Sequence, residues 1–67
     1  MKQITEKERT KKIAKMVTVA EGWFSRGFTV KQVQMGLWNS FGYTVMDFED
    51  RVEIWAANKN YATVYAK

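Results

Sequence analysis

Apolar residues recur at three- and four-residue steps through the first third of the chain. They are Ile13, Met16, Val17, Ala20, Trp23 and Phe24, and this spacing places side chains on one face of an α-helix. Gly27 is the natural end of that helix, because glycine adopts the positive φ of a helix terminus without steric cost. The pattern predicts a first helix over residues 5–26, with fraying expected over residues 1–5.

A second helix is marked at both of its ends. Thr29 is a candidate N-cap and Gln32, three residues later, completes a capping-box pattern. Phe28 lies where a hydrophobic staple would require it, and Gly42 ends the segment. The apolar positions between these signals fall on one face: Val30, Val33, Leu37 and Phe41. We therefore predict a helix over residues 30–41.

The last third of the chain favours extended structure. Residues 51–56 alternate in character, and residues 61–66 are rich in β-favouring side chains. Asn58-Lys59-Asn60 between them is typical of a turn. The segment after Gly42 also has strand character, so the pattern predicts a meander of strands over 43–48, 51–56 and 61–66.

A third helix over residues 48–58 is the competing interpretation. Asp47 would be its N-cap, and the acidic residues that follow would suit the positive end of the helix dipole. Phe48, Val52, Trp55 and Ala56 would share its apolar face. The predicted fold class is α+β, with two helices packed on a small three-stranded antiparallel sheet in the order α-α-β-β-β. The alternative is an all-α three-helix domain.

The length of the chain limits how it can be stabilised. Its 67 residues make one domain, 1–67, and they include neither Cys nor His. Disulfides are thus excluded, and a zinc site is disfavoured. A small core must then rely on its ten aromatic residues, three Trp, three Tyr and four Phe, or on a homo-oligomer.

The composition also disfavours catalysis. Without His or Cys, the usual general bases and thiol nucleophiles are missing. The acidic cluster of Asp47, Glu49 and Asp50 fits a turn or helix start, and no glycine spacing matches a phosphate-binding loop. We expect no enzymatic activity, no cofactor and no metal. The polar N-terminus and the lack of a long apolar run lead us to expect a cytoplasmic protein without a membrane segment.

Basic residues on the first helix suggest a polyanionic partner. Eleven Lys and Arg against seven Asp and Glu give a net charge of +4. Lys7, Lys11 and Lys15 follow four-residue steps opposite the apolar stripe, and Lys12 and Arg26 flank this row. Such a face can follow phosphates, although a solvated helix face would have the same composition. On the second helix, Lys31, Gln34 and Trp38 are predicted secondary contacts with nucleic acid.

Aromatic residues of the predicted sheet suggest a second surface. Alternation directs one set toward the helices: Val52, Ile54, Ala56, Ala62 and Val64. It directs Trp55, Tyr61, Thr63 and Tyr65 to the opposite face. Two helices can cover only one face of such a sheet. Trp55, Tyr61 and Tyr65 would therefore be available to stack on bases, to dock a protein partner or to meet a second copy in a homodimer.

The function predicted from sequence is a non-enzymatic, nucleic-acid-binding accessory or regulatory protein. Its small, cofactor-free chain suits a regulator encoded by a phage, another virus or a mobile element. The alternative is a protein–protein interaction module, either an inhibitor or adaptor of a larger host protein or a homodimer. That alternative would use the aromatic sheet face.

Overall fold

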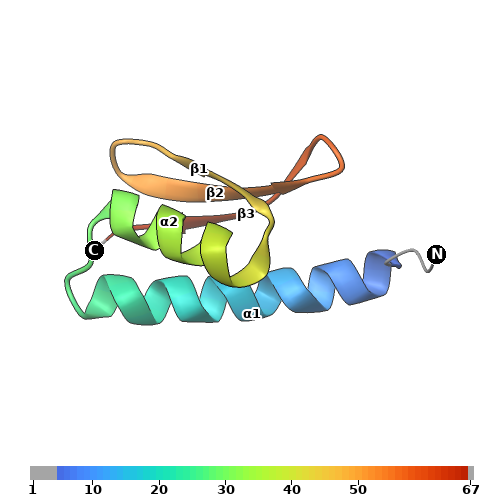
Figure 1. Cartoon of the computed structure of the whole chain (residues 1–67), viewed down its shortest axis with the longest axis horizontal. Coiled ribbons are helices and arrows are strands. Elements are labelled where there is room, and N and C mark those ends of the chain that lie inside the picture. Colours follow the sequence, from blue (N-terminus) through green and yellow to red (C-terminus); the bar gives the residue numbers. More distant parts are fainter. Residues whose placement is uncertain (1–4, 67) are drawn as a thin grey trace.

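The computed structural model describes residues 5–66, which form two helices followed by three strands. The elements are α1 (Glu6–Ser25), α2 (Val30–Phe41), β1 (Thr44–Asp47), β2 (Arg51–Ala56) and β3 (Lys59–Tyr65). The strands form one antiparallel sheet in the order β1-β2-β3. Both helices lie on the same side of the sheet (Figure 1). The predicted α+β fold is thereby confirmed, and the all-α alternative is wrong.

Each helix starts with a capping box. The Thr29 hydroxyl accepts from Gln32 N–H at 3.1 Å, and the Gln32 side chain accepts from Thr29 N–H at 2.9 Å. Thr5 and Glu8 make the same reciprocal pair at the start of α1. Because the two bonds satisfy backbone donors that a helix start leaves free, they fix where each helix begins. The predicted fraying concerns residues 1–4, which lie outside the described residues, and Thr5, which is an ordered cap.

The helices are joined by a Schellman turn centred on Gly27. Gly27 has φ of 91°. Its N–H donates to the Phe24 carbonyl at 3.0 Å, and Phe28 N–H donates to the Trp23 carbonyl at 3.1 Å. The rings of Trp23 and Phe28 stack with centroids 6.0 Å apart and planes 10° apart. This is the apolar contact that usually accompanies the motif. Gly27 therefore ends the helix as predicted, with Arg26 as the C-cap residue outside the helix.

One apolar core lies between the helices and the sheet. Alternate residues of the strands face it, and α1 packs mainly on β3 while α2 packs on β1 and β2. The fully or almost fully buried side chains are Ile13, Met16, Ala20, Phe24, Val33, Leu37, Val45, Val52, Ile54 and Val64. The predicted stripes on both helices are therefore the faces that the fold buries.

The hairpin between β2 and β3 departs from the prediction. Its two-residue turn is Ala57–Asn58, with φ of 51° and 60°, so Lys59 already belongs to β3. Positive φ at both positions matches the type I′ turn that follows the right-handed twist of a hairpin. A bulge follows, because Ile54 pairs with Ala62 but Trp55 pairs with Asn60, and Tyr61 is the extra residue. The bulge was not predicted, because the prediction for this strand used a strict two-residue alternation that a bulge interrupts.

Candidate functional site

The lysine row of α1 faces away from the core. Lys7, Lys11, Lys12 and Lys15 are all exposed, and none is within ion-pair distance of a carboxylate among residues 5–66. At 100° per residue, the row of Lys7, Lys11 and Lys15 lies opposite the buried stripe. Glu8 is the one acidic residue among them. We define these four lysines as the basic row.

Other basic residues of the helix layer lie apart from the basic row. Arg26 is exposed at the C-cap of α1, and Lys31 is exposed in the first turn of α2. Lys31 shares a stripe of α2 with Met35 and Trp38, which are 52% and 51% exposed. Since Gly36 contacts Trp23, it marks the side of α2 that faces α1. Trp38, two positions further on, points to the opposite side.

Gln34 does not point outward as predicted. Its Nε2 donates to the Val45 carbonyl at 2.9 Å, and the side chain is half-buried. Val45 lies on β1, which is an edge strand. Gln34 therefore satisfies a backbone acceptor at the sheet edge, and its side chain is not directed toward an external ligand.

Tyr61 lies on the helix-covered side of the sheet, opposite to its predicted position on the uncovered face. Its hydroxyl donates to the Glu6 carboxylate at 2.8 Å and accepts from Arg9 at 3.4 Å. The hydrogen bond with Tyr61 and the nearby negative charge of Glu6 raise the pKa of Arg9. The bulge causes this reversal, because an extra residue shifts the alternation of the strand. The predicted aromatic surface thereby loses Tyr61, which joins β3 to α1 instead.

Trp55 and Tyr65 remain on the uncovered face of the sheet. Tyr65 is 62% exposed and Trp55 is half-buried. Trp55 Nε1 donates to Glu53 Oε1 at 3.1 Å, and Arg51 Nε donates to Glu53 Oε2 at 3.1 Å. Hydrogen bonds with Glu53 and Asp50 raise the pKa of Arg51, so the guanidinium stays charged. Met46 also lies on this open face and is 43% exposed. The sequence pattern did not predict it as part of the surface.

A hollow of about 270 Å³ opens at one end of this face. It is lined by Thr44, Met46, Trp55, Ala56, Ala57 and Asn58. Thr44 pairs with Trp55 across the strands, so alternation places both on the uncovered face. The hollow is therefore formed by the open sheet face and the adjoining hairpin turn.

The two predicted surfaces lie on opposite sides of the molecule. The basic row is on the outside of the helix layer, whereas Trp55 and Tyr65 lie on the side of the sheet that the helices leave uncovered (Figure 1). A ligand that follows the lysines cannot also lie flat on the aromatic face. Phosphate contacts and base stacking on Trp55 or Tyr65 are therefore separate possibilities.

Neither sequence nor structural relatives assign a role to these surfaces. Comparisons with protein-family models, curated proteins and solved structures gave no match for this chain. Between residues 5 and 66 no three acidic side chains gather as a metal-binding group. No helix in that range is long and apolar enough to cross a membrane. A function has to be inferred from the chemistry of the surfaces themselves.

Proposed function

We propose that this protein is a non-catalytic binding protein whose ligand is nucleic acid, held through its phosphates by the basic row of α1. The observation that carries the proposal is the row itself, four exposed lysines on one side of α1 that have no ion-pair partner among residues 5–66. Lys7 and Lys15 are about 12 Å apart along the helix axis at 1.5 Å per residue. One strand of duplex DNA presents about three or four phosphates over that length.

Charge distribution supports this choice of surface. Four of the seven carboxylates belong to residues 47–53, in the β1–β2 hairpin. Arg51 is neutralised there by Asp50 and Glu53, at 2.9 and 3.1 Å. The unpaired positive charge of the described residues is therefore concentrated on the helix layer. Contacts of this type give affinity without sequence readout and depend strongly on salt.

The test is a titration of labelled random-sequence DNA and RNA, single- and double-stranded, at several salt concentrations. Lys11→Gln should lower the slope of log affinity against log salt by about 0.9 for duplex or about 0.7 for single strands. Lys11→Arg is the matched control, because it changes the same exposed side chain and keeps its positive charge. Lys11→Glu/Lys15→Glu should abolish binding. No binding at low salt, or equal effects of the two single variants, would refute the proposal.

A second candidate is a protein-docking function of the open sheet face. Two observations support it. The charges of Arg51 and Glu53 on this face neutralise each other in an ion pair. The face also carries Met46, Trp55 and Tyr65 beside the 270 Å³ hollow. Trp and Tyr are favoured anchors of protein interfaces. Affinity capture should compare the unmodified protein with Trp55→Ala and with Lys11→Glu/Lys15→Glu. A protein partner on this face must be lost with Trp55→Ala and kept with the lysine variant.

A further inference from the structure

The outer edge of β3 carries backbone groups that have no partner in the described fold. Ala66 N–H donates to the Asp50 carbonyl at 2.9 Å, so the peptide groups of Ala66 face β2. These groups alternate in direction along a strand. The backbone N–H and C=O of Val64 therefore also face β2, while those of Thr63 and Tyr65 point outward from the sheet edge. Within residues 5–66, neither residue makes a backbone hydrogen bond outside the sheet.

The two edges of the sheet differ in whether a side chain bonds to their outward backbone groups. On β1, Gln34 reaches over and donates to the outward carbonyl of Val45. On β3 no side chain bonds to the backbone of Thr63 or Tyr65 within the described residues. Its one charged residue, Lys59, is at the start of the strand, and the chain contains no proline. Natural sheets usually block such an edge, so an unblocked edge is suited to pairing with another strand.

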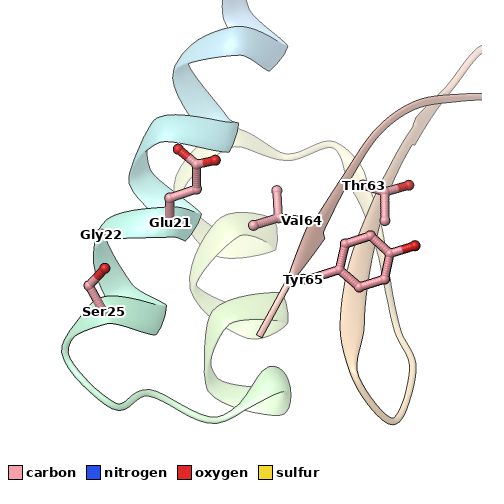
Figure 2. A pocket seen from close by; sticks show the side chains of 6 residues that line it. All are labelled: Glu21, Gly22, Ser25, Thr63, Val64 and Tyr65. Atoms are coloured by element: carbon pink, nitrogen blue, oxygen red, sulfur yellow. The ribbon is translucent and has the colours of Figure 1, made fainter. Parts of the chain in front are cut away.

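A groove runs along the same edge (Figure 2). It has a volume of about 560 Å³ and is lined by Glu21, Gly22 and Ser25 of α1 and by Thr63, Val64 and Tyr65 of β3. Val64 points toward the helices, and Thr63 and Tyr65 point to the opposite face. Glu21 is the only charged residue of the lining, and it has no ion-pair partner in residues 5–66. The groove therefore suits an extended strand that brings a positive charge.

We propose that a second copy of this chain occupies the groove, by antiparallel pairing of β3 with β3 about a two-fold axis near Thr63. The two sheets would join into one of six strands. Such an interface uses the same surface on both copies, as closed dimers generally do.

Charge complementarity selects the second copy as the occupant. In an antiparallel pair, the start of one strand lies beside the end of the other. Lys59 of the second copy is thus brought toward the Tyr65 end of the first, where Glu21 lies. Lys59 pairs with Ala56, a residue packed against the core, so its side chain is on the helix side of the sheet, as Glu21 is. The two-fold axis forms this contact twice.

The same two-fold axis also sets the relative direction of the two α1 helices. In Figure 1 α1 and β3 run in the same direction, and they are packed together. A two-fold axis that makes the strands antiparallel also makes the two α1 helices antiparallel. The lysine-bearing first half of one helix is then beside the Glu21-bearing second half of the other. Because the axis is perpendicular to the sheet, all four helices lie on one face, and the two basic rows share one side of the dimer.

The first experiment is sedimentation equilibrium of the full chain from about 1 µM to about 1 mM, the range of weak specific association. The mass should rise from 7.9 kDa toward twice that value. Amide hydrogen exchange at low and high protein concentration locates the interface. The Thr63 and Tyr65 amides should become protected only at high concentration. A monomer over the whole range would overturn the proposal. The samples contain no nucleic acid, so this result is independent of the proposed function.

A charge exchange tests the register. Glu21→Lys and Lys59→Glu should each weaken the dimer about tenfold, and the double variant should recover to within about threefold of the original, because the pair is re-formed with reversed signs. Glu49→Lys is the matched control, since it makes the same charge change at an exposed residue of the β1–β2 turn. If the double variant is no better than the single ones, the proposed pairing is wrong.

A backbone variant tests the edge directly. Thr63→Pro removes an outward N–H and should abolish the dimer, while proline at an outward position of an edge strand is compatible with the sheet. Circular dichroism establishes whether the variant folds, and if it does not, the charge exchange decides. A dimer that survives both Glu21→Lys and Thr63→Pro but is lost with Trp55→Ala would place the interface on the open sheet face and refute the edge.

Discussion

The indole of Trp23 lies directly against the backbone of Gly36. A Cβ at Gly36 would be 2.7 Å from Cζ3 and 2.9 Å from Cη2 of the ring. Real Cβ atoms essentially never approach so closely. The glycine therefore allows α1 and α2 to approach closely at this point. The ring of Phe28 stacks on the indole and keeps it in place.

This contact predicts opposite effects for two glycines within helices. Gly36→Ala should lower the free energy of unfolding by about 1–3 kcal/mol, because overpacking outweighs the better helix propensity of alanine. At Gly22, no atom of the described residues lies within 4 Å of the new methyl group, so Gly22→Ala should raise the free energy of unfolding by up to about 1 kcal/mol. Urea unfolding at low protein concentration measures both. Equal stabilisation by the two changes would contradict the close approach at Gly36.

Tyr43 has a buried hydroxyl that finds no hydrogen-bond partner within residues 5–66. Leaving such a group unsatisfied costs about 1–3 kcal/mol, and replacing it with an apolar group of the same shape removes that cost. We expect Tyr43→Phe to raise the free energy of unfolding by about 1 kcal/mol. Thermal and urea unfolding test this. A loss of more than about 1 kcal/mol would mean that the hydroxyl is satisfied, for example by water.

Ala57 adopts a backbone conformation that disfavours alanine. Its φ of 51° is in the left-handed region, which costs an L-residue about 1–2 kcal/mol. Ala57→Gly should stabilise the protein by about 0.5–1 kcal/mol, because relief of this strain exceeds the greater entropy of glycine in the unfolded chain. Ala14→Gly, at an exposed site within α1, should instead destabilise by about 1 kcal/mol. The same sign for both changes would contradict a type I′ turn.

Gln34 should contribute to stability through its bond to the β1 edge. Gln34→Ala is expected to cost about 0.5–1.5 kcal/mol, the net value of one hydrogen bond. Asn39→Ala is the control, because Asn39 is exposed on the same helix and makes no side-chain hydrogen bond among the described residues. Urea unfolding at matched protein concentration compares them. No difference between the two variants would show that the edge carbonyl is equally well satisfied by water.

Most of the helical part of the fold could be predicted from local signals. The Thr29–Gln32 box, Gly27 and Gly42 act within a few residues of themselves, so they fix helix ends without reference to the rest of the chain. The meander was also predicted, but the bulge at Tyr61 was not. A bulge is fixed by pairing with a neighbouring strand, and single-strand alternation contains no signal for it.

The candidate site was only partly predictable for the same reason. Helical periodicity placed the lysines of α1 on the outer face, and the structure has them there. Periodicity did not reveal that Gln34 would turn toward Val45, or that Tyr61 would bond to Glu6, 55 residues away. These contacts join segments that only the fold brings together.

What the sequence by itself determined was the extent of the two helices, their buried stripes and the outward row of lysines, because each depends on periodicity and capping over a few residues. Whether residues 48–58 form a third helix or part of a three-stranded sheet was decided only by the structure, which has β2 over Arg51–Ala56. What only the tertiary structure decided was the side of the sheet on which Tyr61 lies, the close approach of Trp23 to Gly36 and the unequal protection of the two sheet edges. It also decided that the basic row and the open aromatic face lie on opposite sides of the molecule. Those properties depend on strand register and on how the layers pack, which are set by contacts between residues distant in the chain.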